Sequence, residues 1–286
     1  MTQLILGTAQ FGSAYGVTNA RGRLDDEAVT SVLRLGRARG VDTFDTAADY
    51  GDSQERLGRL APEGGRYVTK FSLPLPGESV GPADLFGDSM VALRVDRLSG
   101  VMFHKVADLD DPRSASAVDI LVQARSAGTI ERAGVSIYDH ADLELALRRF
   151  PTLDLLQFPG NMLDRRLLDS PRIAGLRDSG VELHVRSAFL QGILLAPVAS
   201  LSTFFAPLAP VLVGLEQFAA RNHTTVLGLV LRYLRDHPVV DRVVVGATTH
   251  EEFEQIANEW DADEAIAPAW QCPLDQALLD PRHWPR

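Results

Sequence analysis

The sequence predicts a (β/α)8 barrel of the TIM type, in which eight parallel strands close into a ring with long loops over the C-terminal mouth. Short apolar runs alternate with longer amphipathic stretches along the whole chain, as in proteins that build parallel sheets. Most of these runs are apolar on both sides of the pleat, which is typical of strands covered on both faces. The alternative is a doubly wound sheet. It is disfavoured because residues 7–12, after the first run, do not match its glycine-rich phosphate-binding turn.

Eight runs are expected to form the strands. They are Leu4–Leu6, Thr43–Asp45, Tyr67–Thr69, Val101–Phe103, Arg132–Val135, Leu153–Phe158, Val181–Val185 and Arg242–Val245. Between them, apolar residues recur at helical spacing, for example in 28–39, 143–149 and 225–235. Gly40, Gly128 and Gly180 each follow such a stretch and precede a strand, where a left-handed helix cap is expected.

One interval is too long for a single βα unit. About 60 residues separate Arg186 from Gly246, roughly twice the ~31 residues per unit of a 250-residue barrel. The excess predicts a long loop over the barrel mouth and an additional helix. The whole chain, 1–286, is expected to form a single barrel domain, with a C-terminal tail from about residue 261 that covers part of the same mouth.

Composition excludes several protein classes. The 45% hydrophobic content is too high for a disordered chain. With 28 basic and 38 acidic residues the net charge is −10, which argues against a nucleic-acid binder. A single cysteine, Cys272, excludes an internal disulfide and favours a reducing, cytoplasmic setting. The sequence is expected to contain no leader and no apolar stretch of the ~20 residues that span a membrane. The oligomeric state does not follow from the composition.

Polar side chains stand where neighbouring strands end, which is the edge at which such barrels build their active sites. The second strand ends in Asp45 with Tyr50 shortly after it, the third is followed by Lys70, and the fourth by His104. Taken singly, Asp45 is equally well explained by a structural ion pair, and Lys70, His104 and Tyr50 are better explained by surface or packing roles. Three adjacent strands that end in Asp, Lys and His, with a Tyr in reach, favour a catalytic group.

These four side chains suit the reduction of a carbonyl group, which leaves negative charge on oxygen and needs a proton donor. Tyr50 is expected to be the acid. Lys70 would lower its pKa, and Asp45 would hold Lys70 in place. His104, as a neutral imidazole, would donate a hydrogen bond to the substrate carbonyl. Because no residue supplies a hydride, a nicotinamide cofactor is required.

At these positions the chain resembles the aldo-keto reductase superfamily, and the resemblance covers nearly the whole sequence. The matching motifs are Phe44-Asp45-Thr46-Ala47 followed by Tyr50-Gly51, Ser53, Glu55 and Leu57-Gly58, then Val68-Thr69-Lys70, Phe103-His104, Gly134-Val135-Ser136, Gln157 with Asn161, and Val245-Gly246-Ala247. The stretch 184–192 further resembles bacterial members from sugar and secondary-metabolite pathways. The resemblance implies that Asp45, Tyr50, Lys70 and His104 form the catalytic tetrad.

The resemblance also implies that NADPH or NADH lies extended across the barrel mouth. Ser136 and Gln157 would bind the nicotinamide carboxamide, with Asp45 and Arg186 close to the same ring. Thr8 would lie near the nicotinamide ribose. The pyrophosphate would lie near Ser187, Phe189, Leu190 and Gln191, and the adenosine phosphate end near Gly246, Ala247, Thr248 and Glu252.

Three departures from the family pattern stand at cofactor positions. Ile137 replaces an Asn beside Ser136, and Arg186 replaces the aromatic residue that commonly stacks on nicotinamide. Glu252 replaces the Arg or Gln that often meets the 2′-phosphate. A carboxylate repels a phosphate dianion but accepts hydrogen bonds from a ribose diol, so NADH is expected to be at least competitive with NADPH.

The predicted function is an NAD(P)H-dependent oxidoreductase that acts on an aldehyde, ketone or sugar carbonyl. One alternative is a cofactor-binding regulatory or scaffold protein without turnover, and another is a sugar lyase or isomerase without net redox change. No metal site is predicted, and His184 and His237 are expected to be structural. Six aromatic residues either line a substrate pocket or only pack, namely Phe11, Tyr15, Phe204, Phe205, Trp270 and Trp284.

Overall fold

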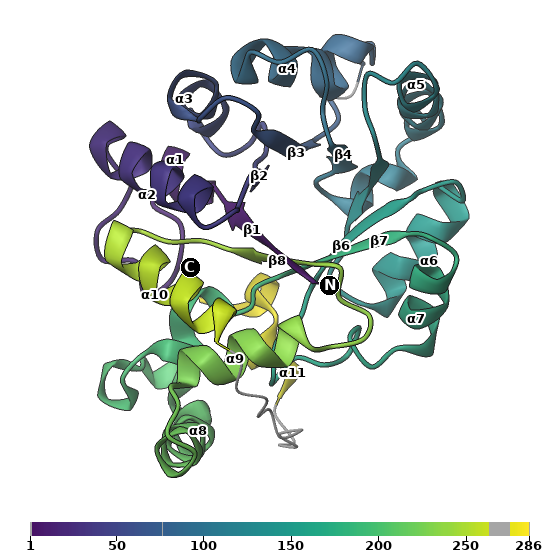
Figure 1. The fold of residues 1–286 in the computed structure, drawn as a ribbon. Helices are drawn as coiled ribbons and strands as arrows, with labels where there is room; N and C mark the ends of the chain where they lie inside the picture. Colours follow the sequence, from purple (N-terminus) through teal and green to yellow (C-terminus); the bar gives the residue numbers. More distant parts are fainter. Residues whose placement is uncertain (1, 76, 263–274, 286) are drawn as a thin grey trace.

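A closed ring of parallel strands forms the centre of the computed structural model, which describes residues 2–75, 77–262 and 275–285 (Figure 1). In chain order the strands are β1 (Gln3–Gly7), β2 (Thr43–Asp45), β3 (Arg66–Phe71), β4 (Gly100–Phe103), β5 (Ala133–Ser136), β6 (Leu155–Pro159), β7 (Glu182–Arg186) and β8 (Arg242–Val245). Each predicted strand is present, with ends within two residues of the prediction. The ring closes where β1 pairs with β8, so the predicted (β/α)8 barrel is confirmed.

Helices follow the strands and cover the outside of the ring (Figure 1). They are α1 (Ala9–Gly12), α2 (Asp26–Ala38), α3 (Ser53–Leu60), α4 (Asp88–Leu93), α5 (Ser114–Ser126), α6 (His140–Arg149), α7 (Pro171–Asp178), α8 (Ala209–Arg221), α9 (Val226–Arg235), α10 (His250–Asp261) and α11 (Gln276–Leu279). In α2 the side chain of Asp25 caps the first turn, and Val29, Val32 and Leu33 are buried. The predicted caps Gly40, Gly128 and Gly180 all have positive φ.

Inside the barrel, a layer of polar side chains lies between a layer of apolar side chains and the mouth. Val68, Met102 and Leu155 form a small apolar cluster that is separate from the main core. Because side chains two residues apart on a strand face the same way, Lys70 follows Val68 and Gln157 follows Leu155 toward the mouth of the barrel. Both of these polar side chains are buried. The C-terminal ends of these strands therefore carry a layer of polar side chains.

The long interval between β7 and β8 holds the predicted loop and extra helix, since both α8 and α9 lie there. The segment Thr203–Arg221, which contains α8, has a mean hydropathy of 1.3 over a span-length window and would pass as a membrane span by length and composition. Its side chains Val211, Leu212 and Leu215 are buried against the core. A core helix passes the same test, so the segment is weak evidence for a membrane.

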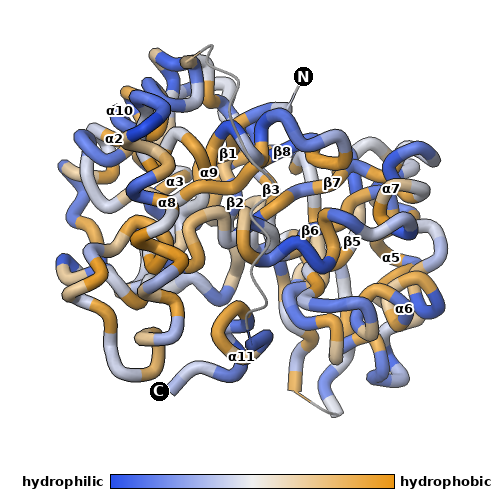
Figure 2. The backbone as a smooth tube through the Cα atoms, turned by 90° about the horizontal axis from the view of Figure 1, so that it is seen from below, coloured by the Kyte–Doolittle hydropathy of each residue, from blue (hydrophilic) through white to orange (hydrophobic). Residues whose placement is uncertain are grey.

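The C-terminal segment packs close to the barrel mouth. The ring of Trp284 meets the ring of Phe205 edge-on at 4.9 Å between centroids, and the Arg282 guanidinium lies 4.5 Å from the Tyr138 ring centroid. In Figure 2, α11 lies between the side of the molecule that carries α8 and the side that carries α6. The remaining part of the tail, with Trp270 and Cys272, lies outside the described residues.

Candidate active site

The four predicted catalytic side chains meet at the end of the barrel where β2, β3 and β4 finish. Lys70 Nζ donates a hydrogen bond to Asp45 Oδ1 at 2.6 Å and another to the Thr46 carbonyl at 3.1 Å. The same ammonium lies 5.2 Å from the centroid of the Tyr50 ring. The His104 ring stands nearly perpendicular to Tyr50, with 5.6 Å between centroids. Three adjacent strands therefore place an acid, a cation and an imidazole around one phenol.

The electrostatics of this group differ in one respect from the sequence prediction. Burial raises the pKa of the Tyr50 phenol above its usual value, and the negative charge of Asp45 raises it further. Burial also lowers the pKa of Lys70, against the opposing effect of Asp45. The pKa of Tyr50 is therefore raised and not lowered in the free protein, with Arg186 as the cation that acts against the rise. The tuning role of Lys70 stays a prediction. At neutral pH the phenol keeps its proton.

His104 has a partner that the sequence analysis did not assign. Its Nδ1 lies 3.1 Å from Asp49 Oδ2, which also accepts a hydrogen bond from Ser72 Oγ at 2.8 Å. Burial and the charge of Lys70 lower the pKa of His104, although Asp49 acts in the opposite direction. Asp49 directly precedes Tyr50, and a carboxylate there is the only signal in the sequence for this contact.

Gln157 belongs to the same network. Its Nε2 donates a hydrogen bond to Asp45 Oδ2 at 2.7 Å, while its Oε1 is buried without a partner in the described structure. Ser136 pairs with Gln157 in the ladder between β5 and β6 and is also buried. Both carboxylate oxygens of Asp45 are thus engaged, one by Lys70 and one by Gln157. The unpartnered oxygen of Gln157 is a ready acceptor for an amide group of a ligand.

A groove of about 830 Å3 begins at Asp45 and Tyr50 and passes under the loops that follow β1, β7 and β8. Its volume lies in the upper part of the range of small-molecule sites. The predicted cofactor residues that line the groove are Thr8, Asp45, Arg186, Ser187, Phe189, Gln191, Gly246, Thr248 and Glu252. Those that are buried and do not line it are Ser136, Gln157, Leu190 and Ala247.

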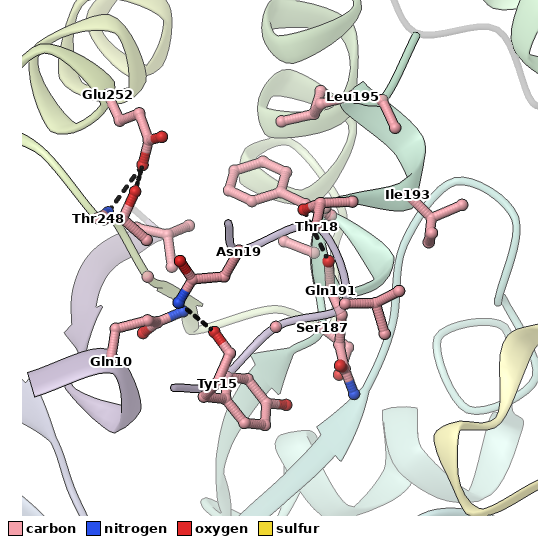
Figure 3. A pocket seen from close by; sticks show the side chains of 18 of the residues that line it. Gln10, Tyr15, Thr18, Asn19, Ser187, Gln191, Ile193, Leu195, Thr248 and Glu252 are labelled. Carbon is pink, nitrogen blue, oxygen red and sulfur yellow. Dashed lines mark hydrogen bonds between the residues drawn. The ribbon is translucent and has the colours of Figure 1, made fainter. Parts of the chain in front are cut away.

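The wall of the groove on the β1 side comes from residues that the sequence analysis largely missed. Residues 15–21, after α1, line the groove opposite the loop that follows β7 (Figure 3). Thr18 Oγ1 donates a hydrogen bond to the Gln191 carbonyl at 3.2 Å, and Asn19 Nδ2 donates one to the Tyr15 carbonyl at 3.0 Å. Of the six aromatic candidates, Tyr15 and Phe205 line the groove; Trp270 lies outside the described residues.

At the other end of the groove, Glu252 is fixed by the loop that precedes α10. Its Oε2 accepts hydrogen bonds from the backbone N–H and the hydroxyl of Thr248, both at 2.7 Å (Figure 3). Thr249 caps the same helix by accepting from the Glu252 N–H at 3.1 Å. Arg21 also lines the groove and has no ion-pair partner within the described part of the chain. A carboxylate and a cation therefore share this end.

Arg186 occupies the end of β7, where its guanidinium stacks on a neighbouring ring. Its Cζ lies 4.2 Å from the Tyr138 ring centroid, and its Nη2 donates to the Ile137 carbonyl at 3.1 Å. In the described residues it has no carboxylate partner, whereas Arg282, on the same Tyr138 ring, is bound to Asp139 and Asp280. Arg186 therefore brings an unbalanced positive charge to the groove.

The two histidines expected to be structural lie away from the groove. His184 is fully buried and contacts Glu182 at 2.7 Å, and His237 Nε2 lies 3.7 Å from Asp169. Within residues 2–75, 77–262 and 275–285, no group of three or more His, Cys, Asp or Glu side chains is arranged to hold a metal ion.

The groove and its residues fit a nicotinamide dinucleotide. The Tyr50 phenol and Asp45 line one end, where Asp45 also holds the Gln157 amide with its unpartnered oxygen. Backbone turns with positive φ at Ser187, Gln191 and Gly192 line the middle. Successive N–H groups in such turns form concave anion sites. The Glu252 carboxylate and the Arg21 guanidinium line the far end.

Comparison with known proteins agrees with this geometry. The model of the Aldo/keto reductase family matches residues 3–265, and no curated protein matches the chain.

Three similar solved structures show the same fold at low sequence identity. An aldo-keto reductase of Bacillus halodurans in its holo form has a TM-score of 0.71 at 18% identity, over 92% of this chain and 88% of that one. The glycerol dehydrogenase of Gluconobacter oxydans has a TM-score of 0.70 at 20% identity, over 92% and 87% of the two chains. An aldo-keto reductase of Klebsiella pneumoniae in complex with NADPH has a TM-score of 0.68 at 20% identity, over 92% and 86%. The chain therefore belongs to the aldo/keto reductase family and is an NAD(P)H-dependent oxidoreductase.

Proposed function

We propose that this protein reduces an aldehyde, ketone or sugar carbonyl with Tyr50 as the proton donor, and that it catalyses the reverse oxidation with Tyr50 as the base. The observation that carries the proposal is the contact of one half-buried phenol with both the Lys70–Asp45 ion pair and the His104 ring. The proposal treats the chain as one catalytic barrel domain in the cytoplasm, with a small-molecule carbonyl compound or sugar as its substrate.

The residues act on the oxygen of the substrate. When bound, the reduced nicotinamide supplies the hydride that reaches the carbonyl carbon. Tyr50 gives its proton to the oxygen as negative charge develops there, and the product is an alcohol. The phenolate left behind lies near the Lys70 ammonium, which stabilises it, and Asp45 keeps that ammonium charged and in place. Because burial raises the pKa of Tyr50, the phenol holds the proton that reduction needs at neutral pH.

The first prediction concerns Tyr50→Phe. Removal of the proton donor should lower kcat by roughly a hundredfold or more, while the dissociation constant of the nicotinamide cofactor changes only a few-fold. Turnover is followed by loss of reduced nicotinamide with a panel of aldehydes and ketones, and cofactor binding by fluorescence titration. Tyr67→Phe is a matched control, because Tyr67 is a buried phenol of β3 that does not line the groove.

Three other outcomes would each contradict the proposed function. Equal losses of turnover and cofactor affinity in Tyr50→Phe would assign Tyr50 to packing. No turnover by the wild type with any carbonyl compound, despite cofactor binding, would favour a regulatory or scaffold protein. Conversion of a sugar without net oxidation or reduction would favour a lyase or isomerase.

The second prediction concerns the cofactor. We propose that NADH binds at least as tightly as NADPH, because the Glu252 carboxylate lines the adenosine phosphate end and repels a second phosphate. Arg21 lines the same end and favours NADPH, so the two charges oppose one another. Glu252→Gln should shift the ratio of the two dissociation constants toward NADPH by about tenfold, and Arg21→Gln should shift it toward NADH. A wild type that strongly prefers NADPH would refute the assignment of Glu252.

A further inference from the structure

We propose that Gly12 positions Tyr50, because the backbone at Gly12 packs directly against the turn that carries the phenol. Residues 50–53 form this catalytic turn. Residues 13–24, which follow Gly12, form the wall loop, since residues 15–21 line the groove. Gly12 lies outside the lining of the groove and acts on the reaction only through Tyr50. This inference rests on the proposed reductase function and makes Gly12 a positioning residue.

The contact between Gly12 and the catalytic turn leaves no room for a side chain on either partner. A Cβ at Gly12 would overlap the carbonyl oxygen of Tyr50 and would lie 2.8 Å from the backbone nitrogen of Ser53. From the other side, Gly51 has a φ of 56°, and its Cβ would overlap the carbonyl oxygen of Gly12. Glycine at both positions therefore lets the two backbones meet.

Hydrogen bonds hold the catalytic turn in place beside this contact. The Ser53 N–H donates to the Tyr50 carbonyl at 3.1 Å, and this is the oxygen that a Cβ at Gly12 would overlap. The Ser53 hydroxyl lies 3.0 Å from the carbonyl oxygen of Thr8 and 2.9 Å from its hydroxyl oxygen. Thr8 Oγ1 in turn donates to the Asp45 carbonyl at 2.9 Å. A side chain at Gly12 would therefore disturb the bond that closes the turn.

One buried cation ties both ends of the wall loop to the helix that follows the catalytic turn. Arg56 of α3 donates through Nη1 to the carbonyl of Phe11 and, at 2.7 Å, to that of Leu24. Its Nε donates to Asp26 Oδ1 at 2.8 Å, which balances the charge. The wall loop is thus an Ω-loop whose two ends are fixed to α3.

The position of the phenol matters because proton transfer depends steeply on geometry. Lys70 Nζ lies 5.2 Å from the Tyr50 ring centroid, and the His104 ring lies 5.6 Å from it. The base of the wall loop is fixed to α3, so an overlap at Gly12 is relieved by movement within the catalytic turn. A displacement of about 1 Å at a reacting group costs about a hundredfold in rate.

A kinetic test compares Gly12→Ala with Gly58→Ala. Gly58 also lies on α3 and its Cβ would overlap the carbonyl oxygen of Ala92, but it neither lines the groove nor contacts the catalytic turn. In Gly12→Ala, kcat should fall by about a hundredfold, while the dissociation constant of the cofactor changes only a few-fold. The solvent deuterium isotope effect on kcat should rise as proton transfer from Tyr50 becomes slower. Gly58→Ala should lose stability and keep the isotope effect of the wild type.

A second measurement reports the position of the phenol without turnover. The chain has five tyrosines, so NMR of protein labelled on its tyrosine rings gives few signals, and Tyr50 is assigned by its absence from Tyr50→Phe. The Tyr50 signal should shift in Gly12→Ala and keep its place in Gly58→Ala.

The outcomes separate this proposal from the reductase function. Weaker cofactor binding in Gly12→Ala with an unchanged kcat and Tyr50 signal would show that the wall loop yields, and would overturn the role of Gly12. A lower kcat with an unchanged isotope effect and Tyr50 signal would assign Gly12 to stability alone. A wild type that reduces no carbonyl compound would refute the proposed function, and the NMR spectra would still decide whether Gly12 positions Tyr50.

If Gly12→Ala does not fold, Arg56→Lys serves for both measurements. A lysine keeps the charge beside Asp26, but its single ammonium does not reproduce the planar fork that holds Phe11 and Leu24. The isotope effect should rise and the Tyr50 signal should shift, with a smaller loss of kcat than in Gly12→Ala. An unchanged isotope effect and signal in Arg56→Lys would overturn the proposal.

Discussion

Arg186 places a positive charge in the groove that no carboxylate of the described structure balances. The oxidised nicotinamide ring is cationic and the reduced ring is neutral, so this charge disfavours the oxidised cofactor. The third prediction is that Arg186→Leu tightens the binding of the oxidised relative to the reduced cofactor by several-fold. Titration of both forms measures the ratio, and Arg186→Lys, which keeps the charge, should preserve it. An unchanged ratio in Arg186→Leu would show that the guanidinium serves only to pack on Tyr138.

At the same scale, residue identity predicted which side chains meet but not how they interact. Asp45, Lys70 and His104 were found because each stands at the end of an adjacent strand, and parallel strands end at one edge. The direction of the Tyr50 pKa depends on burial, which no local pattern reports. The Gln157–Asp45 bond joins residues 112 positions apart, and only the closed ring brings them into contact.

Among the elements, the loops after α1 and β7 have one close contact whose loss should be measurable. Gly192 has a φ of 93°, and a Cβ at this position would collide with the side chain of Thr18 on the opposite loop. The fourth prediction is that Gly192→Ala separates the two loops and weakens cofactor binding by about tenfold, because these loops line the middle of the groove. Gly128→Ala is the control, since Gly128 has a similar φ with nothing near its Cβ position.

Comparison of these two variants separates backbone strain from loop separation. Both introduce a side chain at a left-handed position, which costs each variant about 1–2 kcal/mol of stability, and Gly192→Ala adds the collision with Thr18. Only Gly192→Ala should change the cofactor dissociation constant. If both variants bind the cofactor like the wild type, the contact between the loops does not shape the groove.

The strands and helices were predictable at this scale because a periodic pattern of apolar residues encodes them locally. The loop that follows β7 was predictable in length, since the interval was too long for one unit, but not in path. Its course depends on positive φ at Ser187, Leu190 and Gln191, which are not glycines, and on a hydrogen bond from Thr18 that spans 173 positions. Neither feature leaves a local signal.

At the scale of the whole molecule, ring closure was predictable in kind, because eight alternating units favour a closed barrel over an open sheet. The charge network at the opposite end of the barrel from the active site was not predicted. Glu182, at the start of β7, contacts Arg132 of the segment before β5, His184 of β7 and Arg242 of β8, at 2.7–2.9 Å. The Glu182 carboxylate therefore links β7 with β8 and with the segment that precedes β5.

This network should make the stability of the barrel depend on pH. Burial alone would raise the pKa of Glu182, but the hydrogen bond from His184 and the charges of Arg242 and Arg132 lower it to about 2. A carboxylate whose pKa is lower in the folded than in the unfolded chain stabilises the fold above the unfolded value near 4.5. That stabilisation is lost as the pH falls from there toward 2.

The fifth prediction is that Glu182→Gln lowers the free energy of unfolding at pH 7 by about 3 kcal/mol, which corresponds to the shift in pKa at about 1.4 kcal/mol per unit. The difference between the variant and the wild type should shrink as the pH falls from 5 to 2. Urea unfolding at several pH values measures both effects. Glu144→Gln is the control, because Glu144 is exposed and lies 3.7 Å from Arg172 on the surface, where an ion pair contributes little. A constant difference at every pH would mean that the variant acts through packing, and the carboxylate charge would then have no part in closing the ring.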